Sequence, residues 1–435
     1  MLQRFTEVFR SQEKLSDKWV LLLIFLFPIA GPVVRHWNSS IFVLLSLTSL
    51  YFLFAKKDRK PLYKEEKIYL WSFLLFFLVF IISTISNGYS WEQIQKEGLG
   101  TEIDFLLFIP IYLLIRENKY TQKALFAGIF ISIPVIFLFS LYEYYFSSTN
   151  SLVEISPNNY IKVINGAYSQ LFLGPITALS LLMSFYTYKH CFIDNRWLWL
   201  IAPLFIFMGL FTIGLSAARI AYLTIFFGSF IIVLLHMKSL KITFIAFGLI
   251  ILTATSAYQL DSVKLRTDSA LRNLSNYFTQ INDIKKIEYT SVGQRLEVWR
   301  SSQYILKEHP FMGIGNGNYP TVIKKHIEQD LVSTIVIGMG QAHNTFIEAL
   351  ISKGSIGLIL LLIIFYFPVY TAWKYKKQAY LSFVTVSAFA SLITLMSIGE
   401  SMLINKNNGV SYLLVFSAVL FSSLIYEINT IKNNH

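Results

Sequence analysis

The chain has 435 residues, of which 54% are hydrophobic and only 14% charged, and its net charge is +12. A soluble globular protein carries about 25% charged residues, so the composition excludes an ordinary soluble protein. Uncharged apolar runs of about 20 residues, each long enough to cross a hydrocarbon core of about 30 Å, recur along the chain. Because the excess of Lys and Arg lies mostly in short loops, it indicates membrane orientation and contact with membrane lipids, and no nucleic acid is expected as a partner.

Several chemical classes of site are not indicated by the sequence. The single cysteine, Cys191, excludes an intrachain disulfide and a cysteine-ligated metal site. The histidines at 309, 326 and 343 lack ligand spacing, and there is no Asp-rich motif for Mg²⁺ and no GxxxxGK[ST] loop for nucleotides. We therefore expect neither a metal nor a cofactor.

Hydropathy predicts an all-α bundle of about twelve transmembrane helices. They are expected at residues 19–34, 38–55, 68–86, 102–115, 124–146, 168–187, 197–214, 217–235, 240–258, 343–373, 379–398 and 410–427. The span at 102–115 is short and begins with Glu102 and Asp104, so a re-entrant segment is the alternative there. Alternate loops are basic when both termini are cytoplasmic, as in the loop with Arg116, Lys119 and Lys123, and an odd number of spans breaks this pattern.

The spans divide the chain into three predicted parts. Residues 1–258 are expected to form a membrane bundle of about nine spans, with an uncleaved first helix. Residues 259–342 are expected to form a large, mostly helical periplasmic loop, and residues 343–435 to add about three spans. The loop shows helical spacing of apolar residues at Leu296, Trp299 and Leu306 and at Ile323, Ile327 and Leu331. His309 and Pro310 are expected to end its first helix, and the glycines between 313 and 317 to form a turn. A second outside loop, 147–166, is a candidate to cover the same face.

Arg219 is predicted at the outer end of the eighth span. Arginines at membrane depth are costly and usually face a bundle interior or a water-filled cavity. The structural alternative is an arginine that extends to lipid headgroups. The small residues Gly214, Ser216, Ala217 and Ala218 before it permit close helix approach and leave space for a ligand, which favours the first interpretation.

Arg295 and His343 are the other principal candidates. Arg295 stands in the first turn of a loop helix, where an anion such as phosphate is favoured, although a solvated helix charge is the simpler explanation. Arg300 follows on the same helix as a weaker candidate. His343 lies where the large loop re-enters the membrane, and its ordinary pKa near 6.5 suits a general base. Asn344, Glu348 and Glu400 are possible supporting residues, with Glu400 alternatively a helix cap.

Two arginines and one histidine are thus expected to converge on the outer face of a helical bundle. Two guanidinium groups can hold a diphosphate by bidentate hydrogen bonds, and the imidazole can take a proton from an attacking hydroxyl. This set of residues predicts transfer of a group from a lipid-linked diphosphate to an alcohol.

At these residues the chain resembles the bacterial O-antigen ligases, which share a membrane domain with O-antigen polymerases and bacterial protein O-oligosaccharyltransferases. The segment 214–223 resembles the family's S/T-x-x-R motif around Arg219, and 291–313 resembles the segment around Arg295. The segments 341–348 and 353–358 resemble its H-x-H-N-x-x-x-E…G-x-x-G-L signature, but Gln341 replaces the first histidine, so only His343 carries over. The likeness covers roughly residues 160–405.

The resemblance implies a metal-independent, inverting glycosyltransferase of the membrane-embedded C type. Its donor is a polysaccharide on undecaprenyl diphosphate and its acceptor a sugar hydroxyl of lipid A–core, on the periplasmic face of the bacterial inner membrane. On this resemblance Arg219 and Arg295 bind the diphosphate and His343 is the base. An O-antigen polymerase, a protein O-oligosaccharyltransferase and a polyprenyl-glycan transporter remain alternatives, although no inverted repeat supports a transporter.

Overall fold

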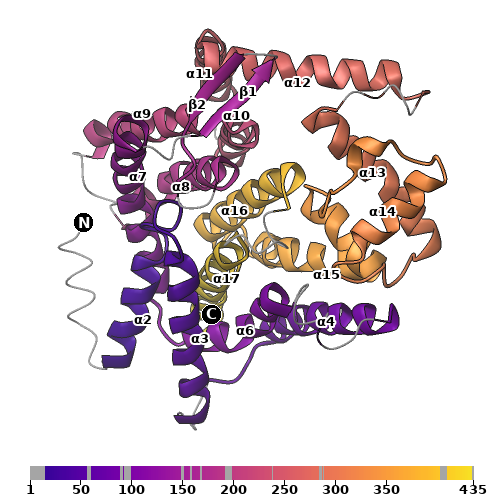
Figure 1. The fold of residues 1–435 in the computed structure, drawn as a ribbon. Helices are drawn as coiled ribbons and strands as arrows, with labels where there is room; N and C mark the ends of the chain where they lie inside the picture. The colour runs from indigo at the N-terminus through magenta and orange to yellow at the C-terminus, as the bar shows by residue number, and fades with distance from the viewer. Residues whose placement is uncertain are drawn as a thin grey trace.

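The protein is a bundle of membrane helices with a helical extension at one end, as Figure 1 shows for the computed structural model. The structure describes residues 15–55, 60–88, 92, 99–147, 151–156, 159–166, 169–191, 198–237, 239–283, 287, 289–401 and 409–433. The bundle helices are α2 (Leu15–Leu26), α3 (Trp37–Ala55), α4 (Lys64–Ser86), α6 (Gly100–Ile115), α7 (Thr121–Phe146), α8 (Gln170–Cys191), α9 (Leu198–Ser216), α10 (Arg219–Leu235), α11 (Leu240–Tyr258), α15 (Thr345–Lys374), α16 (Tyr380–Gly399) and α17 (Gly409–Asn433).

The predicted polytopic helical fold is confirmed, with a helix on each of the twelve predicted spans. Within the described residues, eight helices are long and apolar enough to cross a membrane, and α9 and α10 are shorter apolar helices. The first predicted span, 19–34, is wrong at its end, because α2 stops at Leu26 and turns follow. Pro28 and Pro32 lack the N–H that a continuing helix needs. Gly31 also lies so close to α3 that a Cβ there would overlap the side chain of Asn38.

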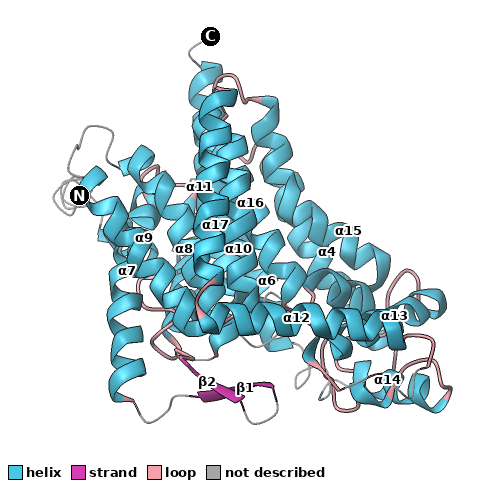
Figure 2. Cartoon of the chain, turned by 90° about the horizontal axis from the view of Figure 1, so that it is seen from above, coloured by secondary structure: helices cyan, strands magenta, loops and turns pink. Residues whose placement is uncertain are grey.

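The segment 147–166, which was predicted to be a second outside loop, contains a β-hairpin that the sequence did not predict. Strand β1 (Ser151–Ser156) pairs antiparallel with β2 (Asn159–Val163). Figure 2 shows the hairpin at the same end of the bundle as the loop helices, opposite the end where α17 finishes. The carboxylate of Glu143 accepts hydrogen bonds from the backbone N–H groups of Asn165 and Gly166, at 2.8 and 2.9 Å, which fixes the return of the chain toward α8.

The described part of the large polar segment folds into three α-helices, α12 (Asp261–Gln280), α13 (Ser291–Glu308) and α14 (Tyr319–Glu328), followed by the short 3-10 helix η3 (Thr334–Val336). Thr290 caps α13, since its side chain accepts from the N–H of Gly293 at 3.0 Å. The helix ends before His309 and Pro310 as predicted, because a proline disfavours helical geometry in the residue before it. Leu331 lies beyond α14, whereas Ile323 and Ile327 are on it. The division at residues 258 and 342 stays a prediction.

The loop helices have their own apolar core. Val298 and Ile305 of α13 pack with Ile323 of α14 and with Val336, and each is at most 2% exposed. Burying an aliphatic side chain of this kind stabilises a fold by about 1.5–3 kcal/mol. This second core makes the extension a folded body rather than an open connection between two membrane helices.

The loop is joined to the membrane bundle by backbone contacts at a kink in α15. Gly354 interrupts this helix with a φ of 65°, so the carbonyls of Ile351 and Ser352 are open to partners outside the helix. They accept from the N–H groups of Ile314 and Gly315 at 2.9 and 3.0 Å. A Cβ at Gly354 would lie 2.3 Å from the carbonyl of Phe311, so this contact requires glycine.

A buried ion pair lies beside this kink. Nζ of Lys353 is 2.8 Å from a carboxylate oxygen of Glu102 on α6, and both side chains are fully buried. Asn316 from the glycine-rich turn donates to the same carboxylate at 3.1 Å. The predicted turn at 313–317 is thus confirmed, and its side chains and backbone dock onto two membrane helices.

The buried imidazole of His326 makes the stability of the loop depend on pH. Its Nδ1 is 2.8 Å from Oγ of Ser301, and burial lowers the pKa of His326 below its ordinary value, with Glu308 opposing the shift. A histidine with a lowered folded-state pKa gives full stability above about pH 6.5, and that stability is lost as the pH falls through the folded-state pKa.

We therefore expect α13 and α14 to open more readily below pH 6.5 than at pH 7.5. Hydrogen exchange of the two helices in the purified protein, corrected for the intrinsic effect of pH, measures this change. A His326→Gln variant should lose most of the pH dependence, and an unchanged dependence in that variant would contradict the assignment to His326.

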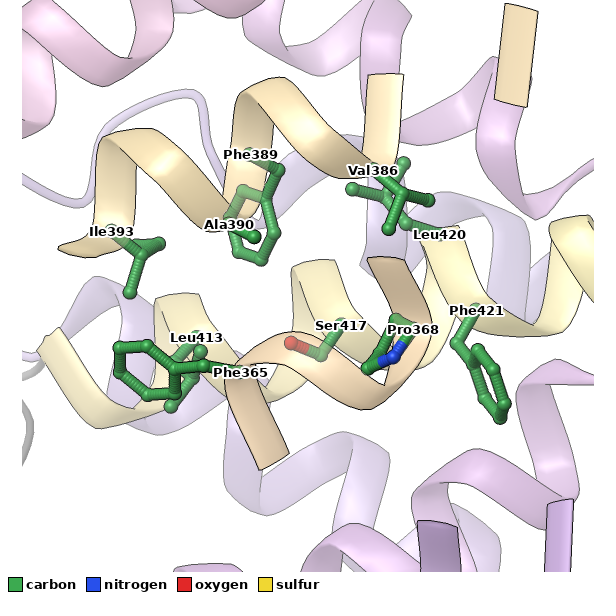
Figure 3. Close-up of a pocket in the computed structure, with 10 residues that line it drawn as sticks. All are labelled: Phe365, Pro368, Val386, Phe389, Ala390, Ile393, Leu413, Ser417, Leu420 and Phe421. Carbon is green, nitrogen blue, oxygen red and sulfur yellow. The ribbon is translucent and has the colours of Figure 1, made fainter. Parts of the chain in front are cut away.

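One small apolar pocket lies inside the bundle, between α15, α16 and α17. Figure 3 shows its lining, which is apolar except for the hydroxyl of Ser417. A site for a charged substrate needs polar groups that converge on it, and this lining does not supply them. The charged residues at the loop end of the bundle are therefore the better candidates for function.

Candidate functional site

His343 lies on a turn that is fixed by contacts on both sides. Its φ is 49°, in the left-handed region that is uncommon for residues other than glycine and that recurs at functional sites. The N–H of Ala342 donates to the carboxylate of Glu348 at 2.6 Å, and the indole N–H of Trp299 on α13 donates to the Ala342 carbonyl at 2.9 Å. The imidazole is thereby placed between the loop helices and the bundle.

Hydrogen bonds join the start of α15 to the end of α16. Asn344 caps α15, since its side-chain oxygen accepts from the N–H groups of Phe346 and Ile347, and its own N–H donates to Oγ of Ser401 at 3.0 Å. The Thr345 hydroxyl donates to the carbonyl of Glu400 at 3.1 Å. Asn344 and Glu348 therefore hold the backbone around His343, and their supporting role in a functional site stays a prediction.

Glu400 connects two of the predicted site residues. One carboxylate oxygen is 2.7 Å from Nδ1 of His343, and the other accepts from Arg295 at 3.3 Å. Because a carboxylate accepts, Nδ1 carries the hydrogen and Nε2 is the nitrogen that can take a proton. Burial lowers the pKa of Arg295, and the charge of Glu400 opposes that shift. Glu400 is also the C-cap residue of α16, so it is a helix cap as well as a contact of His343 and Arg295.

Arg219 is the first residue of α10 and reaches across to two loop helices. Its guanidinium donates to Oγ of Ser269 on α12 and to Oγ of Ser291 on α13, both at 3.3 Å. Ser291 lies about one turn before Arg295 on α13, so this hydrogen bond brings the two guanidinium groups into one neighbourhood. The structure thus brings Arg219, Arg295, His343 and Glu400 together where α10, α13, α15 and α16 meet.

The small residues before Arg219 pack against another helix. Ser216, Ala217 and Ala218 are almost fully buried. A Cβ on Gly174 of α8 would lie 2.6 Å from Oγ of Ser216 and 2.9 Å from Cβ of Ala218. The predicted close approach is present, and the space that the small side chains leave is taken up by α8 on that side.

Arg300 faces away from this group. It lies five residues after Arg295, which turns it to a different face of α13, and it pairs with Glu297 at 3.3 Å. The Glu297 carboxylate also accepts from the hydroxyl of Tyr277 and the N–H of Ser333, both at 2.7 Å. Arg300 therefore belongs to a polar cluster that ties α12 and α13 together.

Two residues near Arg219 were missed in the sequence. Ser269 accepts its hydrogen bond, and Arg266, one turn earlier on α12, is buried and acts on Arg219 through its charge. Their three-residue spacing shows that they share a helix face, but only the folded position of α12 tells which face meets α10. Arg266 was therefore not recognisable among the other charges of the loop.

The structure defines the class of the protein. It is a multi-pass helical membrane protein with a polar, arginine-rich site at one end of its bundle. A family model described as O-antigen ligase matches residues 204–362. A protein of Haemophilus influenzae, described as uncharacterized, is 25% identical over 369 residues, which are 82% of this chain and 86% of that protein. The family match supports the resemblance to the O-antigen ligases that the motifs predicted, over residues 204–362 of the chain.

Arg219 and Arg295 lie inside the matched segment, as does His343, and Glu400 lies outside it. The motif residues that are far apart in the sequence are thus neighbours in the fold.

Proposed function

We propose that the protein is an O-antigen ligase, which transfers a polysaccharide from undecaprenyl diphosphate to a sugar hydroxyl of lipid A–core. The reaction takes place on the periplasmic face of the bacterial inner membrane, with both termini of the chain in the cytoplasm. The observation that carries the proposal is the contact of Glu400 with both His343 and Arg295 inside a helical bundle of this family.

The geometry supports a single displacement. Nε2 of His343 takes the proton from the acceptor hydroxyl, and the oxygen forms a bond to the anomeric carbon of the donor. The bond from that carbon to the diphosphate oxygen breaks, and undecaprenyl diphosphate leaves with the electron pair. Because attack and departure occur on opposite sides of the carbon, the anomeric configuration is inverted.

The two arginines stabilise the leaving group in this scheme. Arg295 shares the Glu400 carboxylate with His343, and Arg219 donates to Ser291, about one turn before Arg295 on α13. Guanidinium groups bind phosphate oxygens in a bidentate manner. Donors that meet a developing negative charge in a site shielded from water lower the barrier strongly. Glu400 is a positioning residue, since it holds the imidazole with Nε2 as the acceptor and also contacts Arg295.

A gene deletion tests the proposed function in the native bacterium. The outer-membrane glycolipids are resolved on a gel, and polymer on lipid A–core is scored separately from polymer on undecaprenyl diphosphate. We expect long polymer to persist on undecaprenyl diphosphate and to disappear from lipid A–core. If only single repeat units remain, attached to the core, the protein is a polymerase and the proposal is wrong.

Transfer is also expected to be independent of divalent metal ions, because the arginine side chains neutralise the diphosphate, which in other enzymes is the role of a metal ion. Purified protein, reconstituted with the lipid-linked glycan and lipid A–core, should retain its transfer rate in EDTA. Loss of activity in EDTA that a divalent ion restores would contradict this expectation.

A further inference from the structure

Helix α12 presents two polar residues to the start of α10. Arg266 and Ser269 are three residues apart on α12, as Arg219 and Tyr222 are on α10, so each pair shares a helix face. The hydrogen bond from Arg219 to Ser269, at 3.3 Å, brings these two faces together. The charges of Arg266 and Arg219 act on each other, and the Arg266 charge also acts on the phenol of Tyr222.

Arg266 is buried, and no described carboxylate pairs with it. The residue is only 9% exposed, and its Nε has no hydrogen-bond partner among the residues that the structure describes. The same holds for Nε of Arg219 and the hydroxyl of Tyr222. In the part of the chain that the structure describes, neither Arg219 nor Arg266 forms an ion pair with a carboxylate. Three buried donors are thus left for a ligand, at a place where burying an unpaired cation costs free energy.

The charge of this neighbourhood matches a particular anion. Arg219, Arg266 and Arg295 contribute three positive charges and Glu400 one negative charge, which leaves a net charge of plus two from these four side chains. A diphosphate that links a lipid to a sugar is a diester and carries two negative charges. A lipid monophosphate ester that bears a sugar carries one, and without Arg266 the site would match that smaller charge.

We propose that Arg266 is a third diphosphate-binding residue, which together with Arg219 and Arg295 selects a polyprenyl diphosphate over a polyprenyl monophosphate. This assignment rests on the proposed function, because it takes the lipid-linked donor as the ligand. The guanidinium of Arg266 donates to phosphate oxygens from α12, while Arg219 donates from α10 and Arg295 from α13. The diphosphate is therefore held from three helices, and its binding draws α12 onto the bundle.

Binding of two soluble donor analogues tests the assignment. Farnesyl diphosphate glucose and farnesyl monophosphate glucose, whose phosphate groups carry two negative charges and one, are titrated onto the full-length protein in lipid nanodiscs, and dissociation constants are measured. Hydrogen bonds to charged groups are worth about 10- to 100-fold in affinity. We expect Arg266→Gln to weaken the diphosphate by about this factor and the monophosphate by less than about 3-fold.

Arg272 supplies the matched control. It lies on the same helix but is exposed, so Arg272→Gln removes the same charge without touching the buried group. We expect this variant to bind both analogues as the wild type does. Arg266→Lys, which keeps the charge but not the planar fork, should fall between wild type and Arg266→Gln. Because it keeps a cation against Tyr222, it also serves if the glutamine variant fails to fold.

The outcomes separate this assignment from the proposed function. If the wild type prefers the diphosphate and both Arg266 variants keep that preference, Arg266 is not a diphosphate-binding residue. Equal weakening of both analogues would assign Arg266 a structural role and overturn the proposal. If the wild type itself shows no preference for the diphosphate, the donor assignment in the proposed function fails together with this one.

Discussion

Replacing His343 with alanine should abolish glycan transfer while the protein remains folded in the membrane. General-base catalysis contributes about 10²- to 10⁴-fold to a reaction rate. Among the described residues, His343 is the group in contact with the Glu400 carboxylate that can act as a base. Transfer from an undecaprenyl-diphosphate-linked glycan to lipid A–core by purified protein in nanodiscs measures the effect. His343→Asn is a useful second variant, because asparagine tolerates the left-handed φ of 49° at this position.

Two further variants show whether the effect belongs to the base. Glu400→Gln keeps the size of the side chain, but its amide can donate to Nδ1 and thereby favour the wrong imidazole tautomer, so we expect transfer to fall by at least about 10-fold. His309→Ala removes an exposed imidazole from the same loop and should leave transfer unchanged. Normal surface polysaccharide in cells that carry His343→Ala would refute the role of His343.

Replacing Arg219 with alanine should also abolish transfer, through the leaving group rather than the nucleophile. Removing one donor that stabilises a developing negative charge costs about 10²- to 10³-fold in rate. Arg219→Lys should restore only part of the rate, because an ammonium group lacks the planar fork that binds two phosphate oxygens. The same reconstituted assay measures both variants, and thermal unfolding shows whether each is folded.

The serine partner of Arg219 provides the control for lost packing. Ser291→Ala removes one hydrogen bond from the Arg219 guanidinium but leaves its charge in place. We expect its transfer rate to fall by less than about 10-fold, in line with the modest net value of one such bond. If Ser291→Ala were as inactive as Arg219→Ala, Arg219 would act by joining α10 to α13 instead of by binding the diphosphate.

Membrane helices and loop helices were largely predictable from the sequence, because their signals are local. Apolar runs marked every bundle helix, and His309 with Pro310 marked the end of α13. The end of the first span was missed, since the run 19–34 stays apolar although its prolines stop α2 at Leu26. The hairpin β1–β2 was missed because short strands in a polar loop leave only a weak pattern.

The candidate site was predictable where residue type alone limits the choice. An arginine at membrane depth and a histidine at the membrane boundary are unusual enough to be noticed, so Arg219 and His343 were singled out. The contact between His343 and Glu400 was not predictable, because the two residues are 57 positions apart in the sequence. Arg266 and Arg300 look alike as loop arginines, and only the packing of α12 and α13 separates the buried, unpaired one from the one that pairs with Glu297.

The broken helix at Gly354 limits how relatives of this protein can exchange parts. Hydrogen bonds cross from residues 310–315 to the carbonyls and N–H groups of residues 351–356, and glycine is needed on both sides of the contact. A hybrid that takes its extramembrane region from one relative and its membrane helices from another must therefore inherit both segments from the same parent. An extramembrane region grafted without the matching half of α15 would lose the backbone hydrogen bonds that join it to the membrane helices.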